Sequence, residues 1–167
     1  MALNCSIEQR ICLLTLTLIL LFALIQPLWA HEYKFGDLEI GHPWSRETPD
    51  GANVATGYLV VKNHGATEDR LIAVSSGISE KGEMHEMSIN ADGVMTMREV
   101  KDIVIPAGGE VALKPGGFHL MFVGLKTPAV KDQKFPGTLT FEKAGKVDVE
   151  FKVEAKAGEM DHSAHGG

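Results

Sequence analysis

Stretches of alternating apolar and polar residues recur along the chain, and turn-forming residues separate them. The clearest stretch is residues 146–155, KVDVEFKVEA, in which every second side chain from Val147 to Val153 is apolar. A period of two is typical of a strand with one buried face. Ala144-Gly145 leads back to residues 138–142, which alternate in the same way, so the two stretches predict a β-hairpin.

Further stretches of strand length are separated by clusters of Gly, Pro and Asn. They are residues 34–40, 56–62, 70–75, 83–89, 94–100, 110–113 and 118–125. No stretch shows a sustained period of 3.6 residues, which a surface helix would require. About nine short strands at this spacing predict an all-β domain, either a β-sandwich or a Greek-key barrel.

The first thirty residues follow a different pattern. Residues 11–28 form an apolar run behind Arg10, and Ala30 then precedes a polar stretch. This arrangement is typical of a secretory signal peptide cleaved after Ala30. An uncleaved membrane anchor is the alternative, because a run of 18 residues can just span a bilayer. We therefore expect a signal peptide over 1–30, one β-domain over 31–155, and no membrane association after cleavage.

Composition narrows the function classes. The 167 residues are 44% hydrophobic, which is enough to build the core of one domain. The net charge is −6 and there is no basic block, so nucleic acid is not expected as a partner. Both cysteines, Cys5 and Cys12, fall in the expected signal peptide. The mature chain therefore has no disulfide scaffold, no thiolate zinc site and no thiolate-ligated blue copper centre.

Three short motifs carry metal-ligand chemistry: His85-Glu86-Met87, Met95-Thr96-Met97 and His119-Leu120-Met121. Each lies in an expected strand, where residues two apart project from the same face. Imidazole and thioether donors without thiolate or carboxylate suit Cu(I) better than zinc or magnesium. The candidate metal ligands are His85, Met97, His119 and Met121.

The competing interpretation is structural. Methionine in a β-protein most often fills the core, which is what we expect of Met84 on the opposite face of its strand. His42 and His64 are expected in solvated loops beside Pro43 and Gly65.

Residues 90–93 predict a hairpin turn between the first two motifs. A five-residue loop would set Met87 opposite Met95 and His85 opposite Met97, so that both motifs share one face. The glycine at the end of the turn suits the left-handed conformation of a G1 bulge. An even-length loop would instead place the two motifs on opposite faces.

The spacing of the four donors resembles that of the periplasmic copper chaperones called PCu(A)C. Their pattern is H(M)X10MX21HXM. In this chain one residue and then ten more separate His85 from Met97, and twenty-one residues separate Met97 from His119-Leu120-Met121. The optional Met after the first His is Glu86 here. Similar surrounding segments are Trp44-Ser45-Arg46, Gly57-Tyr58-Leu59, Ile105-Pro106-Ala107-Gly108-Gly109 and Pro115-Gly116-Gly117-Phe118. The resemblance covers roughly residues 35–153.

The resemblance implies a cupredoxin-like antiparallel β-sandwich and a Cu(I) site formed by His85, Met97, His119 and Met121. It also implies a periplasmic metallochaperone, not an enzyme, that carries copper towards cytochrome c oxidase assembly. The partners it implies are a recipient oxidase subunit and a Sco-type thioredoxin-fold protein.

Three other functions stay open from the residues alone. A copper storage or resistance protein would carry the same site without delivering the metal. An oxidative copper enzyme could use His31 as an N-terminal chelate, but nothing in the sequence locates the second His that it needs. A metal-free, partner-binding β-sandwich would require the four donors to be coincidental.

The C-terminal segment, residues 156–167, has almost nothing to bury and is expected to be a flexible tail. It contains Met160, His162 and His165 beside the carboxylates Glu159 and Asp161. Imidazole with nearby carboxylate suits Cu(II), so these residues predict a second, weaker copper site.

Overall fold

The computed structural model describes residues 32–90 and 93–155 of the 167-residue chain. The expected signal peptide, His31 and the expected tail lie outside the described residues. No helix in the described ranges is long and apolar enough to cross a membrane.

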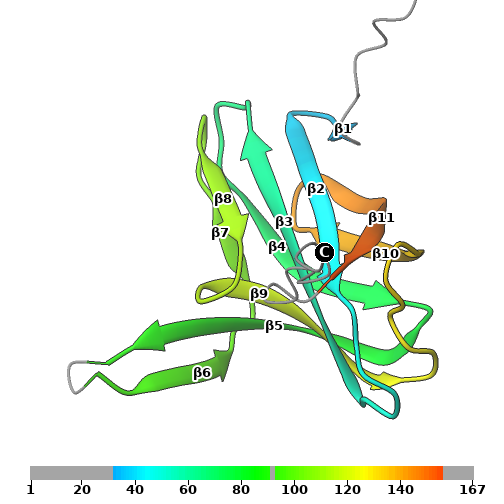
Figure 1. Ribbon diagram of the computed structural model, residues 1–167. Helices are drawn as coiled ribbons and strands as arrows, with labels where there is room; N and C mark the ends of the chain where they lie inside the picture. The colour runs from blue at the N-terminus through cyan, green and yellow to red at the C-terminus, as the bar shows by residue number, and fades with distance from the viewer. Residues whose placement is uncertain (1–31, 91–92, 156–167) are drawn as a thin grey trace, which may run out of the picture. The chain divides into compact units, whose positions relative to one another are not determined.

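The described residues form eleven strands (Figure 1). In chain order they are β1 (Glu32–Phe35), β2 (Leu38–Arg46), β3 (Val54–Asn63), β4 (Asp69–Ser76), β5 (Ser79–Ile89), β6 (Met95–Glu99), β7 (Ile103–Ile105), β8 (Glu110–Leu113), β9 (Phe118–Leu125), β10 (Lys134–Phe141) and β11 (Gly145–Glu154). The expected all-β class is confirmed.

Two expectations about individual strands were wrong, and one strand was missed. Residues 34–40 are not one strand, because a turn at Gly36-Asp37 divides them between β1 and β2. His42 is exposed as expected, but it lies inside β2 and not in a loop, at an irregularity where its φ is +48°. The strand β7 was missed, because three residues are too few to display a period of two.

The strands follow the order β6-β5-β9-β3-β2-β11-β10-β4-β7, with β1 on β2 and β8 on β3. The expected antiparallel pairing holds except between β11 and β2, which pair in parallel from Lys152↔Trp44. Strands far apart in this order come together, since Gly82 of β5 lies directly against the backbone of Val74 in β4. The sheet therefore folds over on itself and encloses a core.

Alternation decides which side chains enter the core. In β11 the residues Val147, Val149, Phe151 and Val153 are buried and their neighbours are more exposed, as the sequence pattern predicts. Phe151 meets Phe122 of β9 and Phe135 of β10 at ring-centroid distances of 5.3 Å each. Aromatic packing of this kind joins β9 to the β10–β11 hairpin across the core.

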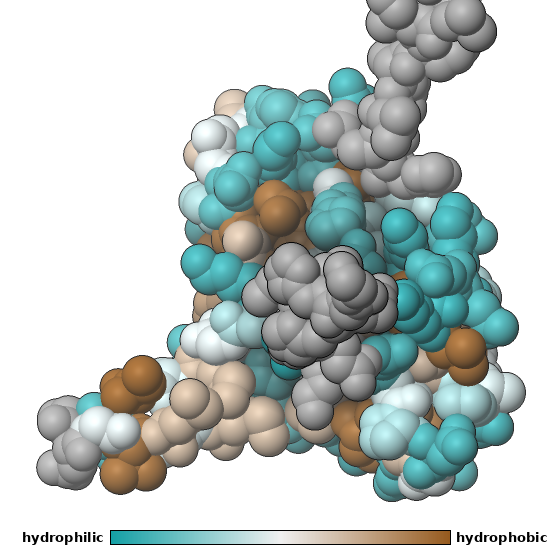
Figure 2. Space-filling model, viewed as in Figure 1, coloured by the Kyte–Doolittle hydropathy of each residue, from teal (hydrophilic) through white to brown (hydrophobic). Residues whose placement is uncertain are grey.

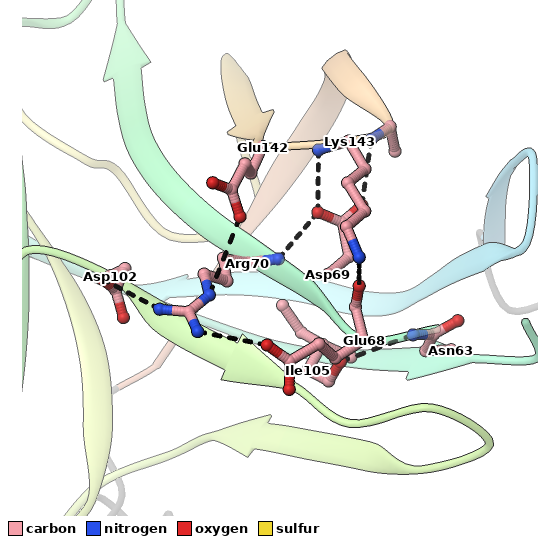
Figure 3. Close-up of polar contacts among 9 residues, drawn as sticks. Asn63, Glu68, Asp69, Arg70, Asp102, Ile105, Glu142 and Lys143 are labelled. Atoms are coloured by element: carbon pink, nitrogen blue, oxygen red, sulfur yellow. Dashed lines mark hydrogen bonds and ion pairs between the residues drawn. The ribbon is translucent and has the colours of Figure 1, made fainter. Parts of the chain in front are cut away.

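One buried carboxylate joins β4 to the turn between β10 and β11 (Figure 3). Oδ1 of Asp69 accepts hydrogen bonds from the backbone N–H groups of Arg70 at 2.7 Å and Lys143 at 2.9 Å. Oδ2 accepts from the N–H of Ala144 at 2.9 Å. The side chain thus supplies acceptors for partly buried backbone donors of the turn.

Candidate metal centre

The three His/Met motifs lie on neighbouring strands in the order β6, β5, β9. Residues paired across antiparallel strands project from the same face. His85 pairs with His119, and Glu83 pairs with Met121, between β5 and β9. Met87 pairs with Met97 between β5 and β6. The four candidate ligands therefore share one face of the sheet, opposite the face on which Met84, Leu120 and Phe122 fill the core.

The hairpin register differs from the expectation by two residues. Met87 lies opposite Met97 rather than Met95, and His85 lies opposite Glu99. The last paired residues are Ile89 and Met95, so the loop has the expected five residues but lies one residue further along the chain. Asn90 ties its ends together: its N–H donates to the carbonyl of Val94 at 2.9 Å, and its Oδ1 accepts from the Val94 N–H at 2.8 Å. A shift of two residues preserves the face, so the motifs still lie on the same side of the sheet.

His119 is held in one orientation by the backbone. His119 is buried, with 4% of its surface exposed, and its Nδ1 lies 3.0 Å from the carbonyl oxygen of Gly117. A carbonyl oxygen only accepts, so Nδ1 carries the proton and donates. The lone pair of Nε2 is then free to bind a metal ion, which is the usual arrangement of a ligand histidine.

His85 has the opposite tautomer. Its Nε2 lies 2.9 Å from Oε2 of Glu83, so Nε2 donates to that carboxylate. Its Nδ1 is buried and has no hydrogen-bond partner in the part of the chain that the structure describes. A buried polar atom without a partner costs free energy, which a metal ion bound to Nδ1 would recover. The imidazole rings of His85 and His119 are 5.8 Å apart between centroids, a span that one ion can bridge with bonds of about 2 Å.

Glu83 is a site residue that the sequence analysis missed. The Lys81 ammonium and then the His85 imidazole, both hydrogen-bonded to its side chain, lower the pKa of Glu83 below its ordinary value. The carboxylate is therefore charged while it holds His85. Its position two residues before His85 in a strand is the signal that could have revealed it, because that spacing places both side chains on one face.

A surface pocket opens beside His119. Its walls include the thioether side chains of Met87, Met97 and Met121. Arg46 and Tyr58 form the side that faces β2 and β3, and the Arg46 guanidinium lies 5.9 Å from the centre of the Tyr58 ring. His85 contributes no surface to this pocket. Met97 is 53% exposed, so it is the candidate ligand most open to solvent.

The chemistry of the donor set is that of soft metals. Among residues 32–90 and 93–155 there is no cluster of three or more His, Cys, Asp and Glu side chains that could hold a metal ion. The pocket instead brings three thioether sulfurs beside His119, and thioether sulfur favours Cu(I) over hard cations. The candidates for a second site, Met160, His162 and His165, lie outside the described residues.

Residues 38–153 match the LpqE-like family, whose description is that of a lipoprotein. The protein Lxx21020 of Leifsonia xyli subsp. xyli (strain CTCB07), also described as a lipoprotein, is 31% identical over 122 residues, which cover 72% of each chain.

Several solved structures have the same fold. The apo PCuAC domain from PmoF1 is 30% identical with a TM-score of 0.67, and the match covers 75% of this chain and 100% of that one. The copper-bound PCuAC domain from PmoF2 is 32% identical with a TM-score of 0.65, covering 75% and 99%. The Cu(I) form of DR1885 from Deinococcus radiodurans is 20% identical with a TM-score of 0.56, covering 78% and 85%. These likenesses confirm the cupredoxin-like β-sandwich, and by the extent of its match the chain belongs to the LpqE-like family.

Proposed function

We propose that this protein is an extracytoplasmic copper carrier that binds one Cu(I) ion and passes it to a recipient protein. The observation that carries the proposal is the cross-strand pair His85↔His119 with Met121 and Met97 on the same face. The copper-bound PCuAC domain from PmoF2 supports the choice of metal.

Copper is the cargo of this site, and the chain's own residues prepare the donors. Nδ1 of His85 and Nε2 of His119 point their lone pairs away from Glu83 and Gly117, which hold the opposite ring nitrogens. Met97 and Met121 add two thioether donors. All four ligands are neutral, so the bound ion keeps its single charge, and the nearby Glu83 carboxylate offsets it.

Delivery requires that an incoming donor reach the ion. His119 is buried, whereas Met97 is more than half exposed, so Met97 is the ligand that a recipient donor can displace. A protein that only stored copper would gain from enclosing every ligand. This exposure favours delivery, and the recipients we propose are an oxidase subunit in cytochrome c oxidase assembly and a Sco-type partner. Action in the periplasm, after signal cleavage, belongs to the same proposal.

The copper site is tested by titrating the purified protein with Cu(I) against a chromophoric chelator under reducing conditions. We expect one Cu(I) per chain, and we expect Met97→Ile to lower the affinity by about tenfold, or ~1.4 kcal/mol. Met84→Ile is the matched control, because it makes the same change on the buried face of β5. Equal affinity in the wild type and Met97→Ile would remove Met97 from the site, and no Cu(I) uptake would favour a metal-free, partner-binding sandwich.

Delivery is tested separately by mixing the Cu(I)-loaded protein with a copper-free oxidase subunit fragment and measuring where the copper resides. Transfer to the fragment is the expected result. Copper that stays on this protein with both candidate recipients would indicate storage instead.

We also propose that Met160, His162 and His165 bind Cu(II) more weakly than the β-domain binds Cu(I). A chain truncated after Gly158 should lose one Cu(II) equivalent and keep its Cu(I) site. If the truncated chain binds Cu(II) as the full chain does, the tail is not a site and His31 is the better candidate.

A further inference from the structure

Met87 occupies a position that the four-ligand site does not use. It lines the same pocket as Met97, His119 and Met121. It is also the cross-strand partner of Met97, and paired residues have Cα atoms about 5 Å apart.

The backbone of Met87 is tied to His119 through a shared acceptor. The Gly117 carbonyl oxygen accepts a hydrogen bond from the Met87 N–H at 3.1 Å and another from His119 Nδ1 at 3.0 Å. The start of the Met87 side chain is therefore held beside the imidazole that is free to bind metal at Nε2. Met97 has a different setting, since all of β6 is exposed and lies at the edge of the sheet.

Resting on the copper site proposed above, we propose that Met87 is a third thioether donor, which binds the ion when Met97 is displaced. The Cu–S bond to Met97 breaks as the bond to Met87 forms, and neither sulfur gains or loses charge or a proton. The ion remains bound to His85, His119 and Met121 throughout. Met97 can then yield its place to a recipient's donor without leaving the ion under-coordinated.

The neighbouring methionine serves as a natural comparison. Met95 lies on the same face of the hairpin as Met97, opposite Ile89, but it is not part of the pocket wall. It belongs to the exposed apolar end of the β5–β6 hairpin, which Figure 2 shows in brown. If exposure of a thioether on this face were sufficient for binding, Met95 and Met87 would behave alike.

The test is a double-mutant cycle with Met87→Ile, Met97→Ile and the double variant, using the Cu(I) competition titration. Each methionine can replace the other, so each single variant should lose less Cu(I) affinity than the double variant. We expect Cu(I) affinity to fall about threefold in Met87→Ile, about tenfold in Met97→Ile and more than ~100-fold in the double variant. Met95→Ile and Met84→Ile are the controls and should bind as the wild type does. A double variant no weaker than Met97→Ile would overturn the role of Met87.

X-ray absorption at the copper edge gives a second readout that a purely structural role of Met87 would not change. Copper bound to Met97→Ile should retain two sulfur neighbours, from Met87 and Met121, and one sulfur neighbour would overturn the inference. The failures of the two proposals are distinguishable. Absence of Cu(I) from the wild type rejects the copper site itself, whereas a normal wild type with one sulfur in Met97→Ile rejects Met87 alone.

Discussion

Asp69 is a single residue whose substitution should affect two strands and a turn. Its two carboxylate oxygens accept three backbone N–H groups, from Arg70, Lys143 and Ala144. Asp69→Asn replaces one acceptor by an NH₂ group that cannot accept, so at least one partly buried backbone donor loses its partner. We expect a loss of about 1–3 kcal/mol in the free energy of unfolding, measured by urea denaturation.

The control for Asp69 is Glu68→Gln at the adjacent position. Glu68 is exposed and forms an ion pair with Arg70, which also faces Asp102 and Glu142 (Figure 3). Exposed pairs contribute little, so this variant should unfold within about 0.5 kcal/mol of the wild type. Equal effects of the two substitutions would contradict the role assigned to the buried acceptor.

Gly82 is required where β5 crosses β4. A Cβ atom at this position would overlap the backbone carbonyl of Val74, which cannot move as the end of a side chain can. We expect Gly82→Ala to lower the free energy of unfolding by about 1–3 kcal/mol or more, as overpacking does. Gly77→Ala is the matched comparison, because a Cβ there meets nothing within 4 Å. Calorimetric unfolding of the two variants should differ clearly, and similar values would refute the clash.

Among the elements, the β5–β6 hairpin has two chemically distinct faces. One face carries the metal donors and continues into the exposed side chains of Ile89 and Met95. The other carries the Ser88–Thr96 hydrogen bond of 3.1 Å and the Glu86–Arg98 ion pair. Because β5 is the one strand that pairs with β6 among the residues described, the closing turn at Gly93 has a large share in holding Met97 in register.

Gly93 adopts a φ of +77°, which costs an L-residue about 1–2 kcal/mol. We therefore expect Gly93→Ala to open the hairpin locally, so that the amides of Met95–Glu99 exchange hydrogen about tenfold faster. The amides of β9 and β3 should keep their protection, and global unfolding should change little. Uniformly faster exchange in all strands would show that the hairpin is not an independent unit.

For the whole molecule, acid stability depends in part on Glu39, which connects β2 to the end of β3. Its carboxylate accepts from Lys62 Nζ at 3.0 Å and lies 3.1 Å from His64 Nε2. Lys62 and then His64 lower the pKa of Glu39 below its ordinary value. A carboxyl group with a lowered pKa in the folded state stabilises the fold above the unfolded-state pKa, and this contribution is lost as the pH falls through the folded-state pKa.

The difference in unfolding free energy between the wild type and Glu39→Gln should therefore be present at about pH 5–6 and shrink below about pH 4. Chemical denaturation across that range measures it. A difference that grows on acidification would contradict the lowered pKa. Glu150→Gln, which removes an exposed partner of Lys134, is the control and should show a smaller pH dependence.

How well the sequence predicts each structural feature depends on whether residues close together in the chain determine that feature. The strand at residues 146–155 was predicted with nearly its observed bounds, because its alternation is long and regular. The sequence did not reveal the division between β1 and β2, the strand β7 or the placement of His42 within β2. Short segments and bulges leave no regular alternation of buried and exposed side chains from which to predict them. The hairpin register was wrong by two residues, because it depends on how Asn90 bonds within the turn.

The sequence by itself determined which donors are present and that the motif residues alternate onto one face, since a strand has a period of two wherever it is placed. Only the tertiary structure decided that β9 lies beside β5, which pairs His85 with His119. It also decided that Met97 remains exposed while His119 is buried. The orientation of each ring is more local, because Glu83 and Gly117 each lie two residues from the histidine that they hold. Strand pairing and burial depend instead on contacts between strands distant in sequence, and such contacts form only when the sheet folds around its core.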